Sequence, residues 1–195
     1  MGTILYMVRH AEAPFSLERE RERGLSDRGK KAAALVTELL ADCGIAAVVS
    51  SPYARAVETV KGLADRMGIP IELEEDLRER QLAGIDYIVE DRDFIPAVEK
   101  LFAEPDFSFP GGESNAASQR RSVAALRRVM ERHKGKSIAV GTHGNIMTVM
   151  MQYFNSSIGL AFWKQTSKPD IYKMEFDDTG SLIAINRLWE EAGSG

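Results

Sequence analysis

The sequence lacks several features that would each define a class of protein. It has one cysteine, Cys43, so no disulfide can form within the chain, and a reducing compartment suits it. Its apolar runs are too short to span a membrane, and Met1–Thr3 lacks the basic residues of a secretory signal. We therefore expect a cytoplasmic protein with no membrane partner.

An excess of positive charge is also missing. The net charge is −4, which argues against a nucleic-acid partner. There are only three histidines, His10, His133 and His143, and their spacing is not that of metal ligands. We expect no metal and no cofactor, and we place His133 at a solvated helix end. The sequence makes no prediction of oligomeric state.

What the chain does have is a regular alternation of apolar runs and helical patterns. Buried strands are predicted at 4–8, 45–49, 70–73 and 137–142, and helices follow at 26–40, 53–67, 94–102, 114–133 and 145–154. Two alternating segments, 170–176 and 182–189, flank a turn and predict a hairpin. The fold class is therefore α/β: a three-layer α/β/α sandwich with a mostly parallel central sheet and a C-terminal β-hairpin. We expect one domain, 1–195, with a cap-like segment at about 80–113.

Three of the predicted strands lead directly into a cation or an imidazole. Arg9 and His10 follow the first strand, Arg55 follows the second, and His143 follows the fourth. The carboxyl ends of parallel strands share one edge of a sheet, where ligands bind. We therefore expect these four side chains to meet in one pocket.

That combination of groups suits a phosphoryl group. Arginine presents paired donors to phosphoryl oxygens, and a neutral histidine can act as a nucleophile. The reaction also needs an acid to protonate the leaving oxygen. Glu79 is the best candidate, although Glu74, Glu75 and Asp76 compete with it.

Six short motifs, in order, make the chain resemble the phosphoglycerate mutase-like branch of the histidine phosphatase superfamily. The matching segments are Val8–Glu12, Leu25–Gly29, Ser50–Thr59, Leu77–Arg80, Pro110–Ser114 and Gly141–Gly144.

The resemblance implies a role for each matching residue. His10 would attack phosphorus and become phosphohistidine, while Arg9, Arg55 and His143 would hold the phosphoryl oxygens. Glu79 would give a proton to the leaving group and later activate water. Further residues are implied to line or support the pocket: Ser16, Glu113, Thr142, through a contact to His143, and Gly144.

The chain departs from the family pattern around the part of the pocket that contacts the rest of the substrate. Ala11 replaces the usual glycine, and its methyl group is tolerated only if φ is negative at this position. Ala13 and Ser16 stand where many members have serine or threonine and then asparagine. We therefore predict a phosphomonoester hydrolase acting on a phosphorylated small molecule. The alternatives are a cofactor-dependent phosphoglycerate mutase and a non-catalytic protein that binds a phospho-ligand.

Aromatic side chains crowd the cap-like segment and allow two interpretations. They could form a small core for the cap, or they could line a pocket for a partly apolar phosphoester. The residues concerned are Tyr87, Phe94, Phe102, Phe107 and Phe109.

Overall fold

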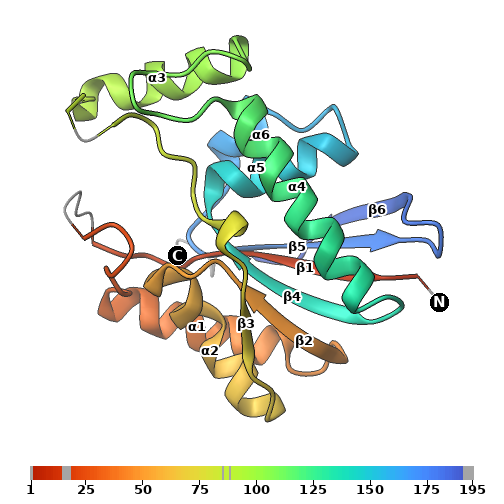
Figure 1. Cartoon of the computed structure of the whole chain (residues 1–195). Coiled ribbons are helices and arrows are strands. Elements are labelled where there is room, and N and C mark those ends of the chain that lie inside the picture. Colours follow the sequence, from red (N-terminus) through yellow and green to blue (C-terminus); the bar gives the residue numbers. More distant parts are fainter. Residues whose placement is uncertain (1, 15–18, 85, 88, 191–195) are drawn as a thin grey trace.

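A six-stranded mixed sheet forms the middle of the computed structural model, which describes residues 2–14, 19–84, 86–87 and 89–190 (Figure 1). The strand order is β3-β2-β4-β1-β5-β6, with β1 to β4 parallel and β5 and β6 antiparallel. The strands are β1 (Ile4–Arg9), β2 (Ile45–Ser50), β3 (Ile71–Leu73), β4 (Ser137–Thr142), β5 (Asp170–Phe176) and β6 (Leu182–Arg187). The predicted mostly parallel sheet with a C-terminal hairpin is confirmed.

Helices cover both faces of this sheet, so the predicted three layers are also confirmed (Figure 1). One face carries α1 (Asp27–Leu40) and α2 (Ala54–Met67). The other carries α4 (Asn115–Arg132), α5 (Gly144–Phe154) and α6 (Leu160–Gln165). None of the described helices is long and apolar enough to cross a membrane.

The central strand β1 shows why its sequence is apolar throughout. Leu5 and Met7 pack in the core on the α4 and α5 side, whereas Tyr6 and Val8 pack against α1 and α2. Successive side chains of a strand point to opposite faces, and here both faces are covered. The chain therefore leaves β1 at Arg9 from the most enclosed position in the sheet.

Most predicted boundaries agree with the structure to within a few residues. Ser26 and Ser114 cap α1 and α4, because their hydroxyls accept from the backbone N–H groups of Gly29 and Ala117. Two short elements were not predicted: the 3₁₀ helix η1 (Glu75–Leu77) and α6. Both are too short to give a clear hydrophobic period.

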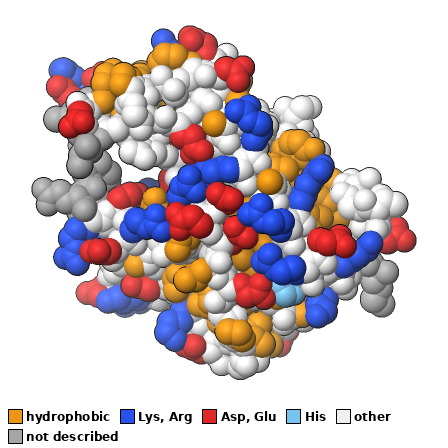
Figure 2. Space-filling view, viewed as in Figure 1, with side chains coloured by type: hydrophobic (Ala, Val, Ile, Leu, Met, Phe, Trp, Pro, Cys, Tyr) orange, Lys and Arg blue, Asp and Glu red, His pale blue; other side chains and the backbone are white. Residues whose placement is uncertain are grey.

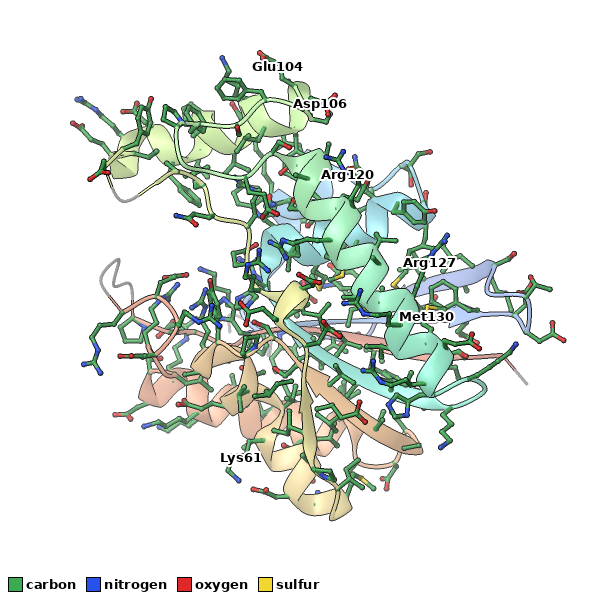
Figure 3. The ribbon with its side chains drawn as sticks, in the orientation of Figure 1. Lys61, Glu104, Asp106, Arg120, Arg127 and Met130 are labelled. Carbon is green, nitrogen blue, oxygen red and sulfur yellow. The ribbon has the colours of Figure 1, made fainter. Side chains whose placement is uncertain are left out.

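The cap-like segment is organised around α3 (Asp91–Ala103), which lies away from the sheet (Figure 1). Glu104 and Asp106 follow the C-terminal end of this helix (Figure 3). An ion pair between Glu99 and Lys164 joins α3 to α6.

Its aromatic rings contact one another or the main core. The ring centroids of Phe107 and Phe109 are 5.0 Å apart, and those of Tyr87 and Phe109 are 5.7 Å apart. Phe94 lies 6.3 Å from Trp163, and Phe102 packs against the main core. Tyr87 and Phe94 are 42% and 44% exposed, so these contacts decide neither of the two interpretations.

Candidate active site

His10 follows β1 directly and is held in one tautomer. Its Nδ1 atom lies 2.7 Å from the carbonyl oxygen of Ala11. Because a carbonyl can only accept, Nδ1 carries the proton and Nε2 keeps a lone pair. Burial, and then the Arg55 cation, hold the pKa of His10 well below its ordinary value. The imidazole is therefore neutral at neutral pH.

Ala11 links the end of β1 to the first turn of α2. Its N–H donates to the hydroxyl of Thr59 at 3.0 Å, and that hydroxyl donates to the carbonyl of Arg55 at 2.7 Å. No described residue other than glycine has a positive φ. The methyl group of Ala11 is therefore accepted without the backbone strain that would require glycine.

Arg55 enters the site from the first turn of α2 and is 1% exposed. Its Nε donates to Nε2 of His10 at 3.2 Å, and its guanidinium lies 4.9 Å from the centre of the Tyr53 ring. Its two terminal nitrogens donate to the carbonyl and the carboxylate of Glu20, both at 2.6 Å. Arg23 donates to the same carboxylate at 2.8 Å.

Arg9 reaches the same place from the last position of β1. Its guanidinium donates to the carbonyl of Thr166 at 2.9 Å and to the Thr166 hydroxyl. A Cβ atom at position 144 would lie 2.7 Å from the Cζ atom of Arg9. Gly144 is therefore needed because the Arg9 guanidinium packs against its backbone.

His143 is fully buried and follows β4. Its ring centroid lies 5.2 Å from that of His10, and its Nε2 lies 2.8 Å from the hydroxyl of Ser51. Its Nδ1 atom is buried and has no hydrogen-bond partner among the described residues. Burial, followed by the charges of His10 and Arg55, holds the pKa of His143 well below its ordinary value. We refer to Arg9, His10, Arg55 and His143 as the basic cluster.

The Glu79 side chain lies against the N-terminus of α5, the helix that begins directly after His143. Its carboxylate accepts from the backbone N–H groups of Asn145 at 3.2 Å and Ile146 at 3.0 Å, and from that of Arg80 at 2.8 Å. The positive end of a helix dipole favours a carboxylate at this position.

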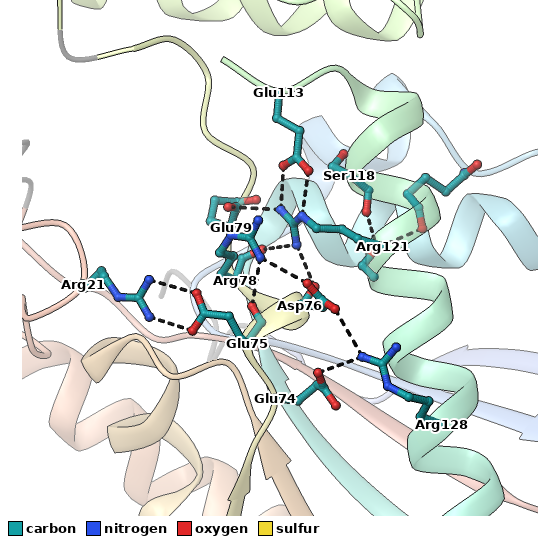
Figure 4. A network of polar contacts seen from close by, with 12 residues as sticks. Arg21, Glu74, Glu75, Asp76, Arg78, Glu79, Glu113, Ser118, Arg121 and Arg128 are labelled. Atoms are coloured by element: carbon teal, nitrogen blue, oxygen red, sulfur yellow. Dashed lines mark hydrogen bonds and ion pairs between the residues drawn. The ribbon is translucent and has the colours of Figure 1, made fainter. Parts of the chain in front are cut away.

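The three competing acids face other partners. Glu75 forms a bidentate pair with Arg21, while Glu74 and Asp76 bind Arg128 on α4 (Figure 4). Of these four acids, Glu79 is the one that is hydrogen-bonded to the first turn of α5, where His143 is the N-cap residue.

One known family matches the chain over most of its length. The profile of the histidine phosphatase superfamily, branch 1, matches residues 5–186, which is nearly the whole chain. The chain belongs to the histidine phosphatase superfamily. The basic cluster lies inside the matched region.

Individual relatives in this superfamily carry different names. Phosphoglycerate mutase-like protein 4 of Arabidopsis thaliana is 34% identical over 154 residues, which are 73% of this chain and 67% of that protein. A metal-independent phosphoserine phosphatase of the same plant is 30% identical over 156 residues, or 74% and 66% of the two chains. The chain thus spans about two thirds of the length of these relatives.

A solved structure gives the same fold. The mycobacterial glucosyl-3-phosphoglycerate phosphatase superposes with a TM-score of 0.75 at 17% identity, covering 96% of this chain and 97% of that one. At that identity the likeness concerns the fold. The superposition therefore supports the α/β architecture described above.

Glu113, predicted to support the pocket, reaches the site through Arg121 (Figure 4). Its carboxylate pairs with the Arg121 guanidinium at 2.7 Å through both oxygens. Arg121 also donates to the carbonyls of Asp76, Arg78 and Glu79, at 2.6, 3.1 and 3.4 Å. The segment that carries Glu79 is therefore fixed from α4.

Basic and acidic side chains alternate over this face (Figure 2).

Thr142 and Ser16 were also predicted to line or support the pocket. Thr142 was expected to hold His143, but its hydrogen bonds lead elsewhere: its hydroxyl donates to the carbonyl of Leu77 at 3.2 Å, and its own carbonyl accepts from the N–H of His10 at 2.9 Å. The cause is the parallel register, which puts Arg9 beside Thr142. Ser16 lies outside the described residues.

Four residues near the basic cluster were missed from the sequence. Glu20 and Arg23 belong to an alternating charged run that resembles an ordinary solvated turn. Ser51 follows β2 as His10 follows β1, so its position was a usable signal. Lys168 precedes β5, and its place depends on the antiparallel direction of that strand. Burial, and then the Arg9 cation, lower the pKa of Lys168.

The charges gathered here define the chemistry that the site can perform. Arg9, Arg55 and nearby Arg23 offer donors to an anion, His10 offers an uncharged nitrogen nucleophile, and Glu79 offers a carboxyl group. Among the residues that the structure describes, no group of three His, Cys, Asp or Glu side chains could hold a metal ion.

Proposed function

We propose that the chain is a phosphomonoester hydrolase that transfers a phosphoryl group first to His10 and then to water. The observation that carries this proposal is the state of His10. The imidazole is neutral. Its Nδ1–H donates a hydrogen bond to the Ala11 carbonyl, and its Nε2 accepts one from the Arg55 cation. A nucleophile that attacks a phosphate anion needs an unprotonated lone pair beside positive charge, and the hydrogen bond from Arg55 to Nε2 breaks as Nε2 attacks.

In the first step the Nε2 lone pair of His10 forms a bond to phosphorus, and the bond from phosphorus to the alcohol oxygen breaks. Glu79, whose carboxylate accepts from three backbone N–H groups, must be protonated for this step, and it then gives that proton to the leaving oxygen. In the second step the Glu79 carboxylate takes a proton from water as the water oxygen attacks phosphorus. The phosphorus–nitrogen bond breaks, phosphate leaves, and His10 returns to its neutral form.

The remaining members of the basic cluster would hold the phosphoryl oxygens. Arg9 and Arg55 stay charged and present forked donors. The Ser51 hydroxyl accepts from the N–H of Tyr53, so its own proton can go to Nε2 of His143. That arrangement leaves the imidazole proton on Nδ1, the atom without a partner among the described residues. His143 would then act as a donor to a phosphoryl oxygen.

These side chains supply the positive charge that a metal supplies in other phosphatases. We therefore expect full activity in the presence of a chelator. A relative that carries the words metal-independent in its name supports this expectation.

A phosphoglycerate mutase would use the same first step, and the name of the Arabidopsis thaliana relative supports that second candidate. The difference lies in the acceptor of the second step: a substrate hydroxyl in a mutase and water in a hydrolase. A protein that only binds a phospho-ligand would perform neither step.

The test measures phosphate release from an aryl phosphate, phosphoserine and glucosyl-3-phosphoglycerate, and 2-phosphoglycerate formation from 3-phosphoglycerate. We expect release from at least one ester, and its rate should fall at least about a thousandfold in His10→Ala. His133→Ala is the matched control, since His133 pairs with Glu72 at the far end of α4. Efficient 2-phosphoglycerate formation would favour the mutase, and equal rates in His10→Ala and the wild type would exclude catalysis by His10.

A further inference from the structure

A carboxylate of the chain itself occupies the donors that a phosphoryl group would use. Glu20 Oε1 lies 2.6 Å from one terminal nitrogen of Arg55 and 3.2 Å from one of Arg23. Its second oxygen lies 2.8 Å from Nε of Arg23. The same Arg55 side chain donates to the nucleophilic nitrogen of His10. The Arg55 guanidinium therefore binds both the Glu20 carboxylate and the proposed nucleophile, His10.

The neighbouring charges of the same turn behave differently. Arg19 and Glu22 pair with each other while their side chains are 72% and 70% exposed. Such pairs contribute little to stability or to structure. Glu20 instead turns toward Arg55, which is 1% exposed. A buried guanidinium needs an anion, and Glu20 provides one.

We propose that Glu20 is a specificity-determining residue that competes with the substrate phosphoryl group for Arg55. The inference rests on the proposed function, because it assigns Arg55 to the phosphoryl group. A phosphoryl dianion brings more charge and more acceptor oxygens than a carboxylate, so it can displace Glu20. Anions with one charge, such as chloride or a simple carboxylate, gain too little to do so.

The surrounding contacts allow the side chain to leave without unfolding the turn. The carbonyl of Arg21 accepts from the N–H of Ala54 at 2.8 Å, at the start of α2. The Arg21 guanidinium is held by Glu75 through two bonds of 2.9 and 2.7 Å. Rotation of the Glu20 side chain, which is 36% exposed, then frees one terminal nitrogen of Arg55, while the other stays bonded to the backbone carbonyl of Glu20. Arg23 can keep its bond to the departing carboxylate.

The test measures the dissociation constant of inorganic phosphate by titration calorimetry for the wild type, Glu20→Gln and Glu22→Gln. Glutamine keeps the size of Glu20 but removes the competing charge. We expect phosphate to bind at least about fivefold more tightly to Glu20→Gln, since a charge-assisted contact no longer has to be broken. Glu22→Gln, on the same turn, should bind as the wild type does.

Unchanged or weaker phosphate binding by Glu20→Gln would overturn the proposal, because Glu20 would then only position Arg55 and Arg23. Should Glu20→Gln fail to give a cooperative thermal transition, Glu20→Ala replaces it with the same criterion.

Phosphate binding needs no turnover, so the result is independent of the proposed hydrolase activity. Tighter binding to Glu20→Gln without hydrolysis of any ester would support the role of Glu20 and reject the proposed function. Hydrolysis without tighter binding would support the proposed function and reject the role of Glu20.

Discussion

Arg55 donates its Nε–H to Nε2 of His10 across 3.2 Å, although the two side chains are only 1% and 6% exposed. A protonated His10 would bring two cations together in a buried site, so this contact exists only with the neutral imidazole. The pair therefore adds to the effect of burial in keeping the proposed nucleophile neutral.

We predict that His10 titrates well below pH 6.5 and that Arg55→Met raises its pKa. Burial is the largest cause of the lowered pKa and remains in the variant, so the rise will be partial. Imidazole resonances followed by NMR against pH give the measurement, with His10→Ala used to assign the His10 resonance. A wild-type His10 that titrates near 6.5 would contradict this prediction.

The two buried histidines should make the protein less stable in acid. In the folded chain the pKa values of His10 and His143 lie well below 6.5, whereas in the unfolded chain both return to about 6.5. Below that pH the unfolded state binds more protons, so the free energy of unfolding falls as the pH falls. The expected slope is about 1.4 kcal/mol per pH unit for each histidine.

Urea unfolding at several pH values between about 7.5 and 5 measures this slope. In His143→Asn one of the two groups is absent, and the slope should be shallower than in the wild type. Identical slopes in the two proteins would show that His143 is not held neutral.

Gly144→Ala should disturb Arg9. A Cβ atom would lie 2.7 to 2.8 Å from three atoms of the buried guanidinium, which cannot move freely because Thr166 holds it. We expect KM for a phosphate ester to rise about tenfold and unfolding to become easier by about 1–3 kcal/mol. Helix propensity alone would act in the opposite direction, since alanine favours a helix over glycine.

The control for this substitution is the same change in an Arg9→Ala background. There the steric conflict is gone, and Gly144→Ala should be neutral or stabilising. A cost that persists without the Arg9 side chain would show that the conflict is not with Arg9.

Arg121→Met should loosen the segment that positions Glu79. Its guanidinium is 13% exposed, pairs with Glu113 and donates to three backbone carbonyls. We expect a loss of about 3 kcal/mol in the free energy of unfolding and a fall in kcat, because a largely buried carboxylate and several carbonyls lose their donor.

Arg128→Met is the matched control on the same helix. Arg128 binds Glu74 and Asp76 with half of its side chain exposed, so its removal should cost less than about 1 kcal/mol and leave kcat unchanged. Equal losses of kcat in the two variants would show that the Glu79 segment does not depend on Arg121.

The parts of the site that follow strand ends could be predicted from the sequence. An apolar strand stops at Arg9, His10 and His143, and the parallel sheet brings those strand ends together. The helices were found through their apolar spacing and their serine caps. These signals are local, so they survive without knowledge of the tertiary structure.

The parts that escaped prediction depend on contacts between distant segments. Glu20 looks the same as Glu18 and Glu22 in the sequence, and only the approach of α2 singles it out. Arg121 is one of several arginines on α4, of which Arg120 and Arg127 are visible in Figure 3. The role expected of Thr142 was wrong because the register between β1 and β4 cannot be derived from either strand alone.

Because β5 is antiparallel to β1, the basic cluster is bordered both by segments that follow strands and by one that precedes a strand. An antiparallel strand begins at the edge where its parallel neighbours end, so Asp170 lies beside Arg9 and the preceding residues 166–169 border the basic cluster. Those residues carry no proposed chemical step. Because Thr166 in this segment holds the Arg9 guanidinium, a change in the approach to β5 would also move a member of the basic cluster.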